Sequence, residues 1–180
     1  MKKLNFIIKY GLALLLLSFY SCESWLNVTP SDRLSEEMLF NDREGFVKAL
    51  NGVYIELNTN ELYGRNLTAG ALDVMGQYYS VASSSHVFYN YGGLVYTGNN
   101  EKALFDNMWQ KCYAVIACCN TIIEKCDENK AGLSPVWRGS IKGEALALRA
   151  MLHFDMLRLF GPLTSELDKE SIPYQTISDQ

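Results

Sequence analysis

The stretch KGEALALRAMLHFDMLRLFG, residues 142–161, decides the fold. Residues 145–160 are apolar almost all round, which is typical of a helix buried between neighbours rather than lying on a surface. Upstream, Ser134-Pro135 supplies a cap residue followed by a first-turn proline. Downstream, Gly161-Pro162 is a strong stop signal. We therefore predict a helix over 135–160 that requires other helices as partners.

A second long helix is predicted over residues 101–127, because its apolar residues recur at helical spacing. A short polar turn, residues 128–133, would join the two helices into an αα-hairpin, the unit of helical repeat proteins. The tetratricopeptide pattern fits only loosely around Trp109 and Ile116. The predicted fold class is therefore all-α, with degenerate tetratricopeptide-like helical hairpins.

An earlier helix is predicted after residues 41–44, which have the outline of a capping box with Asn41 as its cap. Phe46, Val53 and Leu57 follow on one apolar face. Residues 58–100 differ from the rest of the chain, with six glycines, many Asn and Ser, and clustered tyrosines.

Within this loop-rich insertion, residues 69–77 are predicted to be helical. Residues 83–100, SSSHVFYNYGGLVYTGNN, are predicted to be loop with a short hairpin around Gly92-Gly93. The cap of the next helix is expected at Asn99 or Asn100.

The loop-rich insertion also holds the side chains best suited to a ligand surface. Aromatic rings offer flat apolar faces, and an asparagine amide both donates and accepts hydrogen bonds. A sugar ring has an apolar C–H face and equatorial hydroxyls, so stacking plus amide hydrogen bonds suits it. The alternative is that these residues pack the loop onto the scaffold. The candidate ligand-binding residues are Tyr78, Tyr79, Phe88, Tyr89, Asn90 and Tyr91.

The cysteines of the 101–127 helix form a pattern. Cys112, Cys119 and Cys126 recur every seven residues, so they share one stripe and cannot pair with one another within the helix. There is no CxxC motif and no cluster of histidines, so a metal site is not predicted. We expect these three to be small core residues. Cys118 lies off the stripe and either faces a neighbouring element or is a free thiol.

No catalytic or cofactor-binding motif is found, and we predict neither a catalytic residue nor a metal or cofactor. His86 lies in a predicted loop without an adjacent carboxylate. His153 is expected in an internal polar network, and Asp155 is expected to pair with Arg158. Glu144 and Asp155 are separated by about 16 Å of helix rise, too far for a glycosidase carboxylate pair.

The chain begins with the layout of a secretory signal, in which lysines precede an apolar stretch over residues 10–19. That stretch is short for a membrane-spanning helix, which needs about 20 apolar residues. Ser21 directly before Cys22 is the pattern of a bacterial lipoprotein, in which the acylated thiol anchors the mature protein. Without residues 1–21 the chain has 13 basic and 20 acidic residues, a net charge of −7, which argues against nucleic acid as a partner.

These segments together resemble the SusD/RagB-like outer-membrane lipoproteins of Bacteroidetes, over nearly the whole mature chain. The most specific segment is residues 142–161, where Glu144, Arg149, Phe154 and Leu157 match the family's spacing. The five matching features, in chain order, are Cys22 with Trp25-Leu26 and Pro30; ALNGVYIEL at 49–57; MWQKCYAVIACCNTIIEKC at 108–126; KGEALALRAMLHFDMLRLFG at 142–161; and SIPYQT at 171–176.

The resemblance implies a surface lipoprotein of the outer membrane that is not an enzyme. It would capture oligosaccharides, or peptides, and deliver them to a SusC-type TonB-dependent transporter, over which it sits as a hinged lid. Family members are several times longer, so we expect this sequence to be the front part of a longer protein. Its expected domains are a signal peptide over 1–21, a lipidated tether over 22–40 and a SusD-like helical domain over 41–180.

Two alternatives to transport remain open at this point. One is a lipoprotein glycoside hydrolase whose catalytic residues lie in a missing C-terminal part. The other is a tetratricopeptide-like adaptor that binds only proteins.

Overall fold

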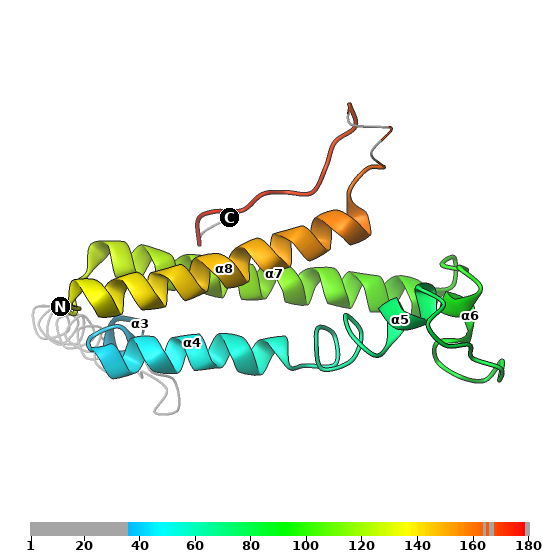
Figure 1. The fold of residues 1–180 in the computed structure, drawn as a ribbon, viewed down its shortest axis with the longest axis horizontal. Helices are drawn as coiled ribbons and strands as arrows, with labels where there is room; N and C mark the ends of the chain where they lie inside the picture. The colour runs from blue at the N-terminus through cyan, green and yellow to red at the C-terminus, as the bar shows by residue number, and fades with distance from the viewer. Residues whose placement is uncertain (1–35, 164, 166–167, 179–180) are drawn as a thin grey trace, which may run out of the picture. The chain divides into compact units, whose positions relative to one another are not determined.

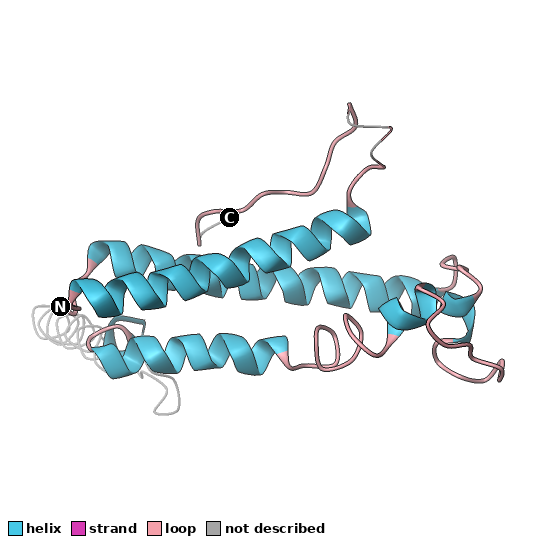
Figure 2. Cartoon of the chain, viewed as in Figure 1, coloured by secondary structure: helices cyan, strands magenta, loops and turns pink. Residues whose placement is uncertain are grey.

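A computed structural model describes residues 36–163, 165 and 168–178, and all regular secondary structure within them is helical (Figures 1 and 2). The predicted all-α fold is confirmed. Chain contacts place Met38–Gln180 in one compact unit. The predicted signal peptide, Cys22 and the tether up to residue 35 lie outside the described residues. The helices are α3 (Glu36–Leu39), α4 (Arg43–Leu57), α5 (Ala71–Met75), α6 (Tyr89–Gly92), α7 (Asn99–Glu128) and α8 (Pro135–Phe160).

α7 and α8 form the predicted αα-hairpin and lie side by side (Figure 1). α8 begins after Ser134, whose Oγ accepts a hydrogen bond from the Trp137 N–H at 3.4 Å, and it ends before Gly161, as predicted. Beyond the end of α7, Asn129 adopts a left-handed conformation with φ of 47°. Its Oδ1 accepts a hydrogen bond from the Leu133 N–H at 2.8 Å. Asparagine tolerates this conformation better than most residues, so the chain reverses within a short turn.

α4 packs against both α7 and α8, but its cap differs from the one predicted. Asp42 rather than Asn41 caps the helix, because its Oδ1 accepts a hydrogen bond from the Gly45 N–H at 2.8 Å. Gly45 is required here, since a Cβ atom would lie 1.6 Å from the Leu39 carbonyl oxygen. The N-terminus of α7 also differs from the prediction, because Gly98 occupies its cap position.

The main core lies between these three helices and buries the apolar stripe of each. The predicted burial of Cys112, Cys119 and Cys126 is confirmed, and all three are free thiols. Burial raises the pKa of Cys112 and of Cys119 to about 12, so both stay protonated and unreactive at neutral pH. Cys118 is also free, and it is exposed. The buried residues are Phe46, Leu50, Val53 and Leu57 of α4, Met108, Cys112, Val115, Ile116, Cys119, Ile122, Ile123 and Cys126 of α7, and Ile141, Ala145, Leu148, Leu152 and Met156 of α8.

α8 is buried on one side rather than all round, contrary to the expectation from its composition. Phe154 is 59% exposed and Leu157 is 45% exposed, whereas Leu152 and Met156 are fully buried. The guanidinium of Arg158 lies 5.1 Å from the centre of the Phe154 ring and covers part of it. Among the described residues, no helix has the length and hydropathy needed to cross a membrane.

The C-terminal strap, which we define as residues 171–178, runs back over the α7–α8 hairpin (Figure 1). Helix side chains hold its backbone. The Tyr113 hydroxyl donates to the Pro173 carbonyl oxygen at 2.8 Å, and the Asn120 amide donates to the Ile177 carbonyl oxygen at 3.0 Å. The strap is therefore fixed by side chains of α7 without forming regular secondary structure of its own.

Candidate ligand-binding site

The tip, which we define as residues 69–98, lies at one end of α7 and carries the candidate ligand-binding residues (Figure 1). The helix predicted over residues 69–77 is confirmed as α5, which is shorter than expected. The hairpin predicted around Gly92-Gly93 is wrong, because residues 89–92 form the helical turn α6. A helical turn places Phe88 and Tyr91, three residues apart, on the same side, where both are buried.

Phe88 and Tyr91 anchor the tip to the scaffold. Their rings meet edge to face with centroids 5.9 Å apart, and Tyr91 meets Phe105 of α7 in the same way at 5.8 Å. Phe105 in turn contacts Phe160 at the end of α8. Burial and the nearby Glu101 carboxylate raise the pKa of Tyr91 to about 12, so its hydroxyl stays neutral. These contacts favour the packing interpretation for Phe88 and Tyr91.

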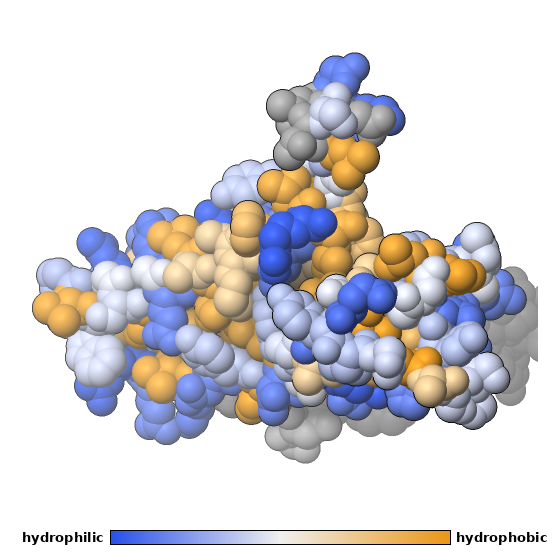
Figure 3. All heavy atoms as spheres, turned by 45° about the vertical axis from the view of Figure 1, so that its right-hand side comes forward, coloured by the Kyte–Doolittle hydropathy of each residue, from blue (hydrophilic) through white to orange (hydrophobic). Residues whose placement is uncertain are grey.

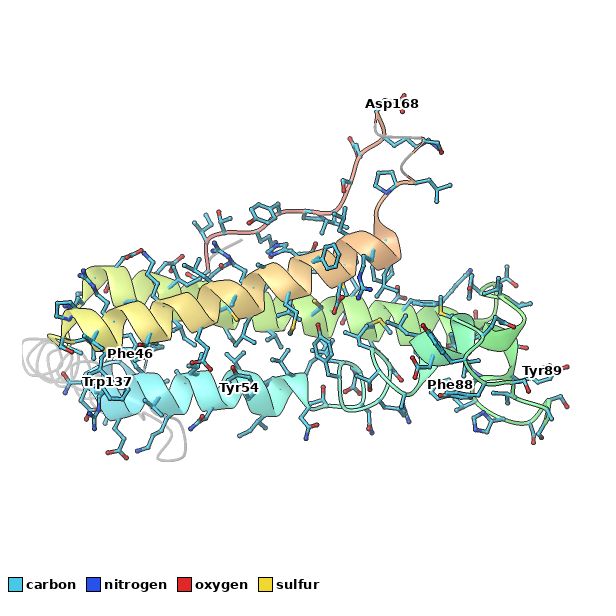
Figure 4. All side chains as sticks on the ribbon, viewed as in Figure 1. Phe46, Tyr54, Phe88, Tyr89, Trp137 and Asp168 are labelled. Carbon is cyan, nitrogen blue, oxygen red and sulfur yellow. The ribbon has the colours of Figure 1, made fainter. Side chains whose placement is uncertain are left out.

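A pocket of about 340 Å³ opens on the tip. Three of the six candidates, Tyr79, Tyr89 and Asn90, line it, and both tyrosines are 43% exposed. Figure 4 places Phe88 and Tyr89 at this end of the molecule, and Figure 3, which turns the same end forward, shows apolar and polar residues mixed over it. Tyr78 is 83% exposed and does not belong to the lining. The lining comprises Gln77, Tyr79, Ser80, Val81, Tyr89, Asn90, Gly92, Gly93 and Val95.

Polar contacts hold the pocket's side chains in position. The Tyr79 hydroxyl donates to the Ala69 carbonyl oxygen, so one end of its ring is tied to the backbone. The Gln77 amide nitrogen donates to the Gly92 carbonyl oxygen at 2.9 Å, which links the two halves of the tip. The Asn90 amide nitrogen donates to Glu101 Oε1 at 2.8 Å. An apolar ring surface beside fixed amides is suited to stacking on a sugar ring and bonding its hydroxyls.

Two of the pocket's determinants, Gln77 and Glu101, were not among the residues singled out from the sequence. Gln77 has a backbone φ of 60°, which few non-glycine residues adopt and which no local motif signals. Glu101 is only 6% exposed although it opens a predicted helix, where a carboxylate is ordinarily a surface residue. Its burial depends on how the tip folds back onto α7.

The histidines and the α8 carboxylates lie outside the pocket lining. Their side chains make hydrogen bonds within the protein that hold the fold together. His86 Nδ1 accepts a hydrogen bond from the Phe88 N–H at 3.1 Å and shapes the loop. Asp155 accepts hydrogen bonds from Tyr63 and Arg158, which confirms the predicted Asp155–Arg158 pair. Glu144 accepts a hydrogen bond from Tyr54 at 2.6 Å. No group of three or more potential metal ligands occurs among the residues that the structure describes.

The chain is similar to known proteins over most of its length. A family model described as SusD-like, starch-binding and associating with the outer membrane, matches residues 24–180. The chain belongs to the SusD-like family. The resemblance found in the sequence is thereby confirmed. The family is one of binding proteins, and its description places the SusD-like chain at the outer membrane.

Two curated relatives come from Formosa agariphila. SusD-like protein P2 is 25% identical over 166 residues, which cover 89% of this chain and 30% of the relative. SusD-like protein P25 is 24% identical over 175 residues, which cover 88% of this chain and 31% of the relative. The SusD-like chain therefore spans about a third of the length of these relatives. No solved structure matches it.

Proposed function

We propose that the protein is a cell-surface lipoprotein that binds oligosaccharides, or peptides, without cleaving them. It delivers them to a SusC-type TonB-dependent transporter in the outer membrane. Membership of a starch-binding, outer-membrane family supports the general role. The observation that carries the proposal is the tip pocket, where Tyr79 and Tyr89 contribute partly exposed rings beside the Asn90 amide.

The size and lining of the pocket favour part of a sugar chain as the ligand. A volume of about 340 Å³ lies at the small end of ligand sites, which suits a sugar unit better than a large cofactor. None of the nine lining residues is an acid or a histidine, so the pocket lacks the carboxyl pair that glycoside hydrolysis ordinarily uses. Binding without hydrolysis is the chemistry that such a lining supports.

Binding and turnover can be separated in one experiment on the purified protein. A panel of polysaccharides is incubated with the protein, and both the bound fraction and the released reducing sugar are measured. We expect binding of at least one glycan and no released sugar. Released sugar would support the alternative of a glycoside hydrolase. Binding of proteins alone, with no glycan retained, would support the tetratricopeptide-like adaptor.

The contribution of the pocket is tested by a matched pair of tyrosine variants. Tyr89→Ala removes a ring that lines the pocket, and we expect it to weaken glycan binding about fivefold, on the order of 1 kcal/mol, with an unchanged melting temperature. Tyr78→Ala removes a more exposed ring outside the lining and is the control. Equal losses of affinity in the two variants would contradict a ligand site at this pocket.

The anchor and the partner are tested in the membrane. Cys22→Ala should leave the domain folded but release it from washed membranes, because the acyl chains would be lost. The wild-type protein solubilised in detergent should co-purify with a SusC-type transporter. Retention of the Cys22→Ala protein in washed membranes would contradict lipidation at this residue.

A further inference from the structure

The two amide side chains of the tip pocket use their donor groups within the protein. The Gln77 amide nitrogen donates to the carbonyl oxygens of Gly92, at 2.9 Å, and of Val74, at 3.4 Å. These two bonds occupy both of its N–H groups. The Asn90 amide nitrogen donates to Glu101 Oε1 at 2.8 Å, which occupies one of its two. Since carbonyl and carboxylate oxygens only accept hydrogen bonds, both amides are held with their nitrogens toward the protein.

The consequence is that the two amides offer a ligand mainly acceptor atoms. The carbonyl oxygens of Gln77 and Asn90 are left for a ligand, together with one N–H group of Asn90. A sugar hydroxyl can donate to such an oxygen, whereas a carboxylate or a sulfate cannot. The lining holds no lysine, arginine or histidine that would balance a negative ligand.

The carboxylate bonded to Asn90 has a charge of the same sign as an acidic sugar. Glu101 is 6% exposed, and its Oε2 lies directly against Gly98, where a Cβ atom would be 2.0 Å away. Its place in the first turn of α7 also suits a negative charge, because the helix N-terminus is electropositive. Glu101 is not part of the lining, but it is bonded directly to Asn90, which is.

The backbone holds this arrangement in place before any ligand arrives. Gln77 and Leu94 adopt φ angles of 60° and 55°, a left-handed conformation that is unusual for a long or branched side chain. Such conformations persist only where the surrounding contacts demand them, and they concentrate at binding and catalytic sites. At Gln77 this conformation occurs together with the hydrogen bond from its amide to the Gly92 carbonyl oxygen.

We propose that the tip pocket selects neutral, hydroxyl-rich sugars and excludes glycans that carry carboxylate or sulfate groups, with Glu101 as the positioning residue. Glu101 orients the Asn90 amide and repels anionic ligands. The inference rests on the proposed function, because it names the class of glycan that the same pocket binds.

The test uses pairs of glycans that share one backbone and differ in charge. Dextran is compared with dextran sulfate, and methyl-esterified polygalacturonan with its de-esterified form, at low and at high salt. We expect the neutral member to bind about tenfold more tightly at low salt, and the ratio to shrink at high salt as charges are screened. Equal or tighter binding of the charged member would overturn the inference while the proposed function stands. If no glycan in the wider panel binds, both this inference and the proposed function are wrong.

Three variants locate the source of the selectivity. Glu101→Gln keeps an acceptor oxygen for the Asn90 amide but removes the charge, so the neutral-to-anionic ratio should fall severalfold. Asp106→Asn removes one negative charge from an exposed position on the same helix and is the matched control. Gln77→Lys places a cation in the lining and should reverse the preference. An unchanged ratio in folded Glu101→Gln protein would contradict the role of Glu101.

Discussion

The scaffold, which comprises α4, α7, α8 and the strap, and the tip hold their side chains in place by different means. In the scaffold, a residue such as Met156 is fixed because it is completely surrounded by apolar neighbours. In the tip, Tyr79 is fixed by its hydroxyl, which bonds to backbone carbonyl oxygens, and much of its ring stays exposed. Packing covers a side chain, whereas a polar anchor at one end leaves the rest accessible to a ligand.

The largest effect is expected where packing is most complete. Met156→Ala should lower the free energy of unfolding by about 2–5 kcal/mol, because it leaves a cavity in the core between α7 and α8. Leu157→Ala, at the next position, removes a side chain that is 45% exposed and should cost much less. Chemical denaturation measures both. Comparable losses would mean that α8 is covered on its outer side in solution.

The next largest effect is expected from removing Tyr91, a buried ring that anchors the tip, in contrast to the exposed rings of the same region. Tyr91→Ala should lower the free energy of unfolding by about 2 kcal/mol, less than a scaffold cavity, because the buried cluster of the tip is small and can partly collapse. It should also abolish glycan binding, since α6 would lose its attachment to Phe105. Hydrogen exchange would report the loss as faster exchange confined to residues 69–98. If stability fell while exchange in the tip was unchanged, the proposed anchoring role would be wrong.

The scaffold and the tip also differ in how far the sequence predicts their structure. In the scaffold, local interactions and helical periodicity determine most features. The ends of α8 follow from Ser134-Pro135 and Gly161, because capping is a local interaction. The cysteine stripe follows from helical periodicity alone. The caps at Asp42 and Gly98 were missed by one residue, since neighbouring polar residues compete for a cap and the winner depends on the preceding turn.

The pocket was only partly predictable. Aromatic composition draws attention to the tip, but it does not distinguish the buried Tyr91 from the partly exposed Tyr89 two residues earlier. That difference arises from the helical turn α6, which forms because Phe88 and Tyr91 both find space against α5 and α7. Gln77 and Glu101 depend on contacts across the tip, which no local pattern encodes.

A smaller effect should appear where the strap meets the scaffold, as a dependence of stability on pH. His153 Nδ1 lies 3.0 Å from the Arg149 carbonyl oxygen, and its Nε2 accepts a hydrogen bond from the Gln175 N–H at 3.2 Å. Protonated His153 could not accept that bond. The charged and titratable groups facing the ring are Arg149 on its own helix, Tyr113 on α7 and Tyr174 on the strap.

Burial, and to a lesser extent the charge of Arg149, lower the pKa of His153 below its ordinary value of 6.5. The folded state therefore binds the proton less readily than the unfolded state. Neutral His153 contributes its full stabilisation of the folded state above pH 6.5. This contribution is lost as the pH falls through the folded-state pKa of His153.

Loss of one hydrogen bond, roughly 1 kcal/mol, should lower the melting temperature by about 2–4 °C in mildly acidic buffer. His153→Gln, whose amide can make both bonds without titrating, should show a weaker dependence on pH. Identical pH profiles for the two proteins would rule out His153 as the origin.

The smallest effect is expected from removing a single hydroxyl from the tip. Tyr79→Phe keeps the ring but loses the hydrogen bond to the Ala69 carbonyl oxygen. Because this bond lies at an exposed position, its loss should cost less than about 1 kcal/mol of stability, since water can replace it. The ring is then free to tilt, so glycan affinity should fall about twofold. Tyr63→Phe makes the same chemical change in the segment after α4, where Tyr63 packs against the core of the scaffold, and it removes a partner from the buried Asp155 carboxylate of α8.

Leaving a buried charged group with one partner fewer should cost about 1–3 kcal/mol and leave glycan affinity unchanged. Tyr79→Phe should therefore lower mainly the glycan affinity, and Tyr63→Phe mainly the stability. Calorimetric unfolding and glycan titration of both variants measure this difference. A larger stability loss in Tyr79→Phe than in Tyr63→Phe would show that the tip is held as tightly as the scaffold. The exposure of its rings would then have to be explained by something other than its polar anchoring.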